Sequence, residues 1–177
     1  RWGLMRNSYD ENIQEHSLQV VLVAHGLATI RNTYFGGAVD ADRVAVLAAY
    51  HEAGEVFTGD LPTPIKYFNP EIKQAYVAIE DFAKGRLQRM LPQELQPSFQ
   101  PLLFPQSAEQ DLWRIVKAAD KICAYLKCVE ELKAGNQEFA KAERTIRQEL
   151  DRFELPEVGY FMEHFAPSFG LALDELN

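Results

Sequence analysis

Hydrophobic residues recur at intervals of three and four along most of the chain, and strand-like alternation is absent, so the pattern predicts an all-α fold. The longest such run lies between Ser107 and Gly135. Its apolar positions are Leu112, Val116, Ala119, Cys123 and Leu126. This spacing predicts one long, largely buried helix over 107–135, and Ser107 with Gln110 predicts a capping box at its start.

Capping residues, glycines and prolines divide the rest of the chain into further helices. Asn12 with Glu15 predicts a capping box at the first helix, and Asn69-Pro70 predicts the start of the third. The second helix begins at Asp40 or Asp42 and ends near Gly59. Together these signals predict helices over 12–32, 40–59, 69–87, 107–135, 139–153 and 160–165.

Apolar residues of the third predicted helix form a stripe that we expect to face the core. Its members are Ile72, Tyr76, Ile79, Phe82 and Leu87. A proline-rich loop, 60–64, precedes this helix, and prolines from Pro92 to Pro105 are expected to break the stretch that follows it.

Length, charge and cysteine content narrow the possible classes of protein. The chain has 177 residues, which predicts a single domain over 1–177, and its net charge of −8 argues against binding a nucleic acid polymer or an anionic membrane through bulk electrostatics. Two cysteines make no disulfide framework, and no apolar run is long enough to span a membrane. We therefore expect a cytoplasmic protein, and the start at Arg1 without an initiator Met suggests an incomplete N-terminus.

The densest polar cluster, His51-Glu52-Ala53-Gly54-Glu55, interrupts an apolar segment of the second predicted helix. On a helix, His51 and Glu55 share a face, and Glu52 lies beside His51. Adjacent His and Glu side chains can ligate a metal, with Glu55 one turn on to hold a water. The alternative is a solvated polar face that carries a His–Glu pair.

Two other polar residues stand where the local pattern favours apolar ones. Asp120 lies within the apolar segment 118–123, where a carboxylate is costly unless it is paired or binds a metal. Lys117 or Lys121 could pair with it instead. His16, in the first turn of its helix, is either a ligand or a capping or core histidine. Convergence of His16, His51, Glu52 and Asp120 would create a mixed N/O site suited to Mn²⁺, Fe²⁺, Co²⁺ or Zn²⁺.

The order His16, His51-Glu52, Asp120 resembles the H…HD…D signature of the HD-domain metal-dependent phosphohydrolases. The sequence that flanks these residues is similar to that of bacterial 5′-deoxynucleotidases of the YfbR type, over nearly the whole chain. The segments that carry this similarity are 1–7, 15–20, 58–64 and 119–132.

This resemblance implies an HD-domain bundle of six or more helices that forms a homodimer and hydrolyses deoxyribonucleoside 5′-monophosphates to a deoxynucleoside and phosphate. It also implies one divalent transition metal per subunit, with Glu55 orienting or deprotonating the attacking water. Arg1 would hold the phosphate and Trp2 would pack on the sugar. The implied metal ligands are His16, His51, Glu52 and Asp120, and the implied substrate-binding residues are Arg1, Trp2, His16, Asp60, Leu61, Pro62, Thr63 and Asp120.

One departure from the family pattern keeps other functions open. The family has Asp where this chain has Glu52, and the extra methylene moves the carboxylate outward by roughly 1.5 Å. We expect an active site with altered metal selectivity. The alternatives are an HD hydrolase acting on another phosphate ester, such as a ribonucleotide, a nucleoside triphosphate or a cyclic nucleotide, and a degenerate HD scaffold that binds nucleotides or proteins without turnover.

Overall fold

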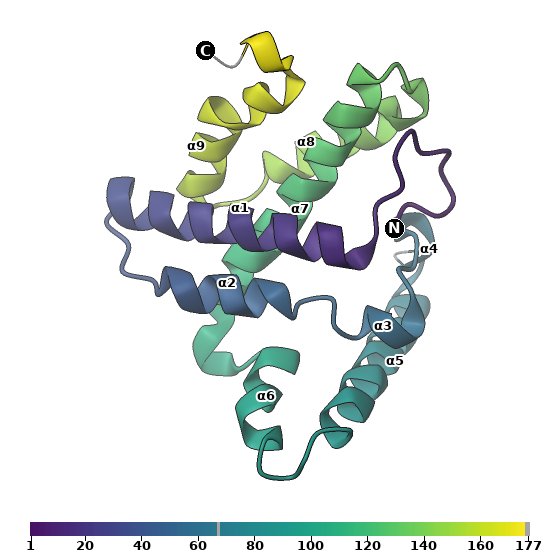
Figure 1. Cartoon of the computed structure of the whole chain (residues 1–177), viewed down its shortest axis with the longest axis vertical. Coiled ribbons are helices and arrows are strands. Elements are labelled where there is room, and N and C mark those ends of the chain that lie inside the picture. Colours follow the sequence, from purple (N-terminus) through teal and green to yellow (C-terminus); the bar gives the residue numbers. More distant parts are fainter. Residues whose placement is uncertain (67, 176–177) are drawn as a thin grey trace.

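The computed structural model of the chain describes residues 1–66 and 68–175, and within these ranges it contains helices and no strands (Figure 1). This confirms the predicted all-α class. The α-helices are α1 (Ile13–Tyr34), α2 (Ala41–Ala49), α3 (Glu55–Thr58), α4 (Thr63–Lys66), α5 (Pro70–Arg89), α6 (Gln96–Leu103), α7 (Gln110–Lys133), α8 (Ala140–Leu150) and α9 (Pro156–His164). Short 3₁₀ segments precede or follow several of them.

The core of the molecule forms where α1 and α2 lie side by side and α7 crosses behind them (Figure 1). Asn12 caps α1 by accepting hydrogen bonds from the N–H groups of Gln14 and Glu15, and the Glu15 side chain accepts from the Asn12 N–H, so the predicted capping box is confirmed. Leu27 and Ile122 are fully buried between these helices, and each contributes about 1.5–3 kcal/mol of burial free energy.

The long helix predicted over 107–135 is confirmed as α7, and Val116, Ala119, Cys123 and Leu126 are buried as the spacing indicated. The predicted capping box at its start is wrong. Residues 107–109 form a 3₁₀ turn, α7 begins at Gln110, and no side chain caps it. Cys123 and Cys128 are buried, unlinked thiols.

The third predicted helix exists as α5, and the Asn69 side chain caps it by accepting from the Ile72 N–H at 2.7 Å. Its predicted core stripe is confirmed only for Tyr76, which is buried, and is wrong for Ile79 and Phe82, which are 53% and 63% exposed. The reason is that α5 lies outside the main bundle and packs mainly against α3, α4 and α6 (Figure 1).

The prediction that prolines break the stretch over 92–105 is wrong, because this stretch contains the helix α6. Pro97 lies in the first turn, where a backbone N–H has no acceptor in the helix, so its ring is tolerated. Pro101 lies inside the helix, and the burial of Leu102 and Leu103 compensates for the missing hydrogen bond. In the predicted proline-rich loop over 60–64, residues 60–62 are not helical, and a single helical turn, α4, begins at Thr63.

Across the part of the chain that the structure describes, no helix combines the length and the hydropathy needed to cross a membrane.

Candidate metal centre

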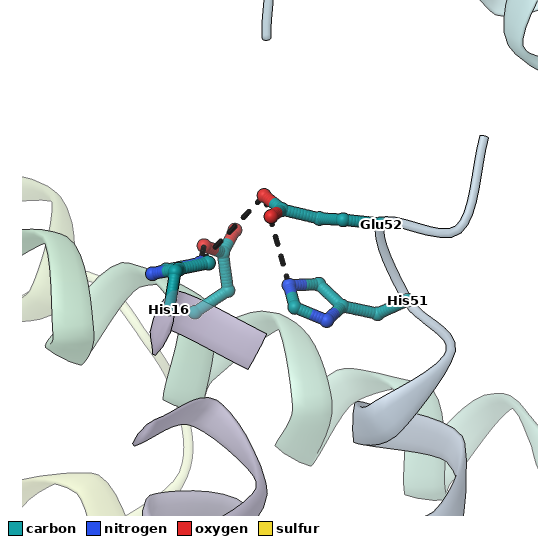
Figure 2. Close-up of side chains that lie close together, drawn as sticks. His16, His51 and Glu52 are labelled. Carbon is teal, nitrogen blue, oxygen red and sulfur yellow. Dashed lines mark hydrogen bonds and ion pairs between the residues drawn. The ribbon is translucent and has the colours of Figure 1, made fainter. Parts of the chain in front are cut away.

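Side chains from three separate segments meet at one end of α1. His16 comes from the first turn of α1, His51 and Glu52 from the turn after α2, and Asp120 from the middle of α7. Each offers one ligand atom, and these atoms all lie within 4.8 Å of one another. Figure 2 shows His16, His51 and Glu52 pointing toward a common point. The predicted convergence of all four residues is therefore confirmed.

The segment that carries His51 and Glu52 is a turn, so the predicted helix over 40–59 is confirmed only for its first part, which Asp40 caps, and is wrong as one continuous helix. α2 ends at Ala49, and residues 50–54 form successive turns before α3 begins at Glu55. The Ala48 carbonyl, which a continued helix would pair with the Glu52 N–H, accepts instead from the His51 N–H and lies 2.7 Å from His51 Nδ1. This ring contact ends α2 and brings Glu52 toward the cluster.

Both imidazoles are oriented as metal ligands usually are. The contact of His51 Nδ1 with a carbonyl makes that nitrogen the N–H donor, so Nε2 presents its lone pair, and Nε2 has no hydrogen-bond partner among the described residues. Nε2 of His16 lies 3.0 Å from Asp120 Oδ1 and 3.6 Å from Glu52 Oε1. Glu52 Oε2 is likewise buried without a partner. The unpartnered nitrogen and oxygen, together with the mixed donor set, fit a divalent cation.

The charges around the two imidazoles act on them differently. Burial lowers the pKa of His16, but its hydrogen bond with Asp120 and the nearby carboxylate of Glu11 outweigh burial and raise it. For His51, burial is the largest influence and lowers the pKa despite the nearby carboxylates. His51 is therefore neutral at physiological pH, as a metal ligand must be.

Glu11 was missed by the sequence analysis. Its Oε1 lies 3.8 Å from His16 Nδ1, and its Oε2 accepts from Arg1 Nε at 3.1 Å. A carboxylate behind the far nitrogen of a ligating histidine orients that ring. Directly before the helix cap Asn12, Glu11 resembles an ordinary surface carboxylate, and no local signal distinguishes it.

Glu55, the predicted water-activating residue, is only 8% exposed and begins α3. Its burial and the charges of Glu52 and Asp60 raise its pKa to about 8, and within the described part of the chain its Oε2 has no hydrogen-bond partner. Carboxylates with such a perturbed pKa beside a cavity are typical of proton-transfer sites. Glu55 does not share a helix with His51, but it stays close to Glu52 because the turn folds back.

A cavity of about 410 Å³ opens beside the cluster, which is within the range of small-molecule sites. Its wall includes the candidate ligands His51, Glu52 and Asp120, and also Glu55. Four lysines line it as well: Lys66 and Lys84, which the sequence analysis did not single out, and Lys117 and Lys121, which it considered only as partners of Asp120. Lys66 pairs with Glu80 and Lys121 pairs with Glu149, and Lys84 and Lys117 add local positive charge for an anionic ligand in an acidic protein. A second cavity, of about 680 Å³ between α8 and α9, contains none of the candidate ligands.

Arg1 lies at the cluster. Its Nη1 donates to Glu52 Oε1, its Nε donates to Glu11, and its backbone nitrogen donates to the Glu11 carbonyl at 2.9 Å. Burial opposes the charge of Arg1, but Glu52, Asp120 and Glu11 outweigh it and raise its pKa.

Neither lysine considered as an alternative partner pairs with Asp120. Among the described residues Lys117 makes no ion pair with Asp120, and Lys121 pairs with Glu149 at 2.6 Å.

The remaining predicted residues whose side chains the structure describes, Trp2 and 60–62, are not among the residues that line the cavity beside the cluster. Trp2 packs its ring on Phe139 with centroids 5.3 Å apart, and its Nε1 is buried without a partner. Asp60 is close enough to raise the pKa values of both Arg1 and Glu55, and Leu61 and Pro62 follow it, all half-buried. The side chain of Thr63 lies outside the described residues.

Comparisons with known proteins agree with this geometry. A family model described as 5′-deoxynucleotidase YfbR-like matches residues 1–169. A 5′-deoxynucleotidase of Vibrio cholerae is 55% identical over 177 residues, which cover 100% of this chain and 91% of that protein. The 5′-deoxynucleotidase YfbR of Escherichia coli (strain UTI89 / UPEC) is 54% identical over 177 residues, covering 100% of this chain and 89% of that protein.

Among solved structures, the crystal structure of an HD-domain phosphohydrolase from Listeria innocua matches with a TM-score of 0.81 at 22% identity. The match covers 96% of this chain and 82% of the other. At this identity the similarity concerns the fold alone, and it confirms the predicted HD-domain architecture.

Proposed function

We propose, since the chain belongs to the family of YfbR-like 5′-deoxynucleotidases, that it hydrolyses deoxyribonucleoside 5′-monophosphates to a deoxynucleoside and phosphate at the cluster described above. The observation that carries the proposal is the meeting of His16, His51, Glu52 and Asp120, within 4.8 Å of one another, beside a cavity of nucleotide size.

His16, His51, Glu52 and Asp120 would hold one divalent cation per chain, of the Mn²⁺, Fe²⁺, Co²⁺ or Zn²⁺ class that mixed N/O donors favour. Such a cation supplies charge that neutralises a phosphoryl group and lowers the pKa of a nearby water. Because Glu52 replaces the shorter Asp of the family pattern, we propose that its longer side chain changes the metal selectivity.

Arg1 would bind the phosphate. Its guanidinium offers the forked donors that match phosphate oxygens, and it now uses them on Glu52 and Glu11. A dianion placed at the cation would compete with Glu52 for these donors. The pairing with Glu11 would keep the guanidinium oriented during that exchange.

Glu55 would accept the proton of the attacking water. In its ionised form, Oε2 has no competing partner and can take the proton as the new P–O bond forms and the bond to the sugar O5′ breaks. The departing O5′ takes up a proton, so that water and ester become deoxynucleoside and phosphate. Nearby positive charge favours the ionised form of Glu55 and so opposes the burial that raises its pKa.

We further propose that Trp2 excludes ribonucleotides and that residues 60–63 line the substrate site. A rigid indole in the space of a 2′-hydroxyl, with no partner for that hydroxyl, could cost a ribonucleotide several kcal/mol as an order of magnitude. The place of Trp2 directly after Arg1 and the proximity of Asp60 to Arg1 and Glu55 support these roles.

A homodimer and a cytoplasmic location stay predictions. The exposed side chains of Leu18 (62%) and Leu22 (66%), one turn apart on α1, support the dimer because they form an apolar face that the described residues leave uncovered. Light scattering of the purified protein tests the assembly. A monomer at micromolar concentration would contradict it.

Phosphate release from dAMP and AMP, with Mn²⁺, Co²⁺ or Zn²⁺ supplied, tests the proposed activity. We expect release that needs the metal and favours dAMP by at least about tenfold. Equal rates on AMP, or a preference for nucleoside triphosphates or cyclic nucleotides, would favour an HD hydrolase on another ester. No release with any metal from the native chain, with release restored by Glu52→Asp, would show that the native site is a degenerate scaffold.

A further inference from the structure

The segment that carries Arg1 and Trp2 has little structure of its own. Residues 1–12 contain no helix or strand, and Leu4 and Tyr9 expose 71% and 69% of their area. Trp2 adopts φ = 58°, in the left-handed region, which costs a residue with a side chain of order 1–3 kcal/mol. Contacts elsewhere in the chain must therefore hold this segment in place.

Glu131, near the end of α7, makes those contacts. Its side chain is fully buried and accepts hydrogen bonds from the Ser8 N–H at 2.8 Å and the Tyr9 N–H at 3.3 Å. Lys127, one turn earlier, donates to Glu131 and also to the Tyr9 carbonyl at 2.6 Å. Burial opposes the charge of Glu131, but the hydrogen bonds from Lys127 and Ser8 outweigh it and lower its pKa to about 2.

Asn136 extends this anchor toward the start of the chain. Its amide donates to Glu131 Oε2 at 2.8 Å and to the Arg6 carbonyl at 2.7 Å. Beyond it, the fully buried Phe139 receives the Trp2 ring. Figure 1 shows the N-terminal segment, in dark purple, running alongside the end of α7.

The same helix carries both the anchor and a candidate metal ligand. Glu131 follows Asp120 by eleven residues, which is about three turns or ~16 Å along one face of α7. A straight helix fixes that separation. The distance between the anchored residues 6–9 and the metal centre is thus set by α7.

We propose that Glu131, with Lys127, is a positioning residue for the reaction: it binds residues 8–9 to the metal-bearing helix and so fixes Arg1 and Trp2 against the substrate. The inference rests on the proposed function, because it concerns residues proposed to touch phosphate and sugar. Glu131 itself contacts no substrate, so its loss should affect substrate affinity and sugar selectivity and leave metal binding unchanged.

The test compares Glu131→Gln with Glu157→Gln. Glu157 is also fully buried and pairs with Arg31 at 2.7 Å, but it joins α9 to α1 at a point about 22 Å along α1 from His16. Asn136→Ala is a milder second variant, since Asn136 is half-buried and its loss leaves the Lys127–Glu131 pair intact.

For Glu131→Gln we expect KM for dAMP to rise at least about tenfold, the equivalent of about 1.4 kcal/mol of binding, with a smaller change in kcat. The preference for dAMP over AMP should fall by a similar factor. Metal content should stay the same, and backbone hydrogen exchange over residues 1–12 should accelerate. Asn136→Ala should change KM, the preference for dAMP and the exchange over residues 1–12 in the same direction but by smaller amounts. Glu157→Gln should lower thermal stability without changing KM, selectivity or exchange over residues 1–12.

Arg1→Ala separates failure of this inference from failure of the proposed function. If Arg1→Ala raises KM while Glu131→Gln and Asn136→Ala do not, the anchor is structural only and the inference is overturned alone. If Arg1→Ala leaves KM unchanged, the proposed role of the N-terminal segment and the inference both fail. An equal KM change in Glu157→Gln would also overturn the inference.

Discussion

Replacement of Glu55 by Gln should stabilise the metal-free protein at neutral pH. In the folded state the pKa of Glu55 is raised from 4.5 to about 8 by burial and by the charges of Glu52 and Asp60. Between these values the folded state holds a proton that the unfolded state has lost, so stability falls as the pH rises from 4.5 to 8. Because pH 7 lies about 2.5 pH units above 4.5, the free energy of unfolding is lower there by about 3 kcal/mol than at acidic pH.

A Gln at this position has nearly the same shape and stays neutral at every pH, so it removes the penalty. Urea unfolding in the presence of a chelator should therefore show Glu55→Gln more stable than the native chain by up to about 3 kcal/mol at pH 7 and by almost nothing at pH 4.5. Glu94→Gln, at an exposed position, is the control and should change stability by less than about 0.5 kcal/mol at both values. An equal gain for Glu55→Gln at both pH values, or no gain at pH 7, would refute the argument from charge burial.

Three further predictions concern activity and metal binding. With metal supplied, Glu55→Gln should retain one cation per chain yet lose about 10²–10⁴-fold in kcat, because the proton acceptor is gone; phosphate release at the native rate would remove Glu55 from the mechanism. Asp120→Ala should lose the metal, measured as metal content after gel filtration, since one of four ligands is removed; one cation per chain in that variant would contradict its assignment. Trp2→Ala should accept AMP more readily, bringing the dAMP-to-AMP ratio of kcat/KM down by at least about tenfold, and an unchanged ratio would show that selectivity lies elsewhere.

Local signals in the sequence predicted some elements well. The capping box at Asn12 and the buried run of α7 follow from residues three and four positions apart, and both are confirmed. The helix over 40–59 failed because its end depends on the His51 ring, which occupies the Ala48 carbonyl. The stripe on α5 failed because exposure depends on which helices pack against α5, and periodicity does not contain that information.

Polar residues at apolar positions located the metal centre. Asp120 stands in a buried helix and is 104 residues from its partner His16, yet both residues violate the local pattern in a way that a shared cation explains. Glu11 and Glu131 escaped notice because each follows or precedes other polar residues, as surface carboxylates do. Their roles depend on contacts with distant segments, which only the folded chain displays.

The metal centre requires that four side chains share one cation. An anomalous-scattering map of the protein crystallised with Mn²⁺ or Co²⁺ measures this. We expect a single strong peak among His16, His51, Glu52 and Asp120. A map without a peak at this position, or with the metal bound elsewhere and away from these residues, would rule out the shared site.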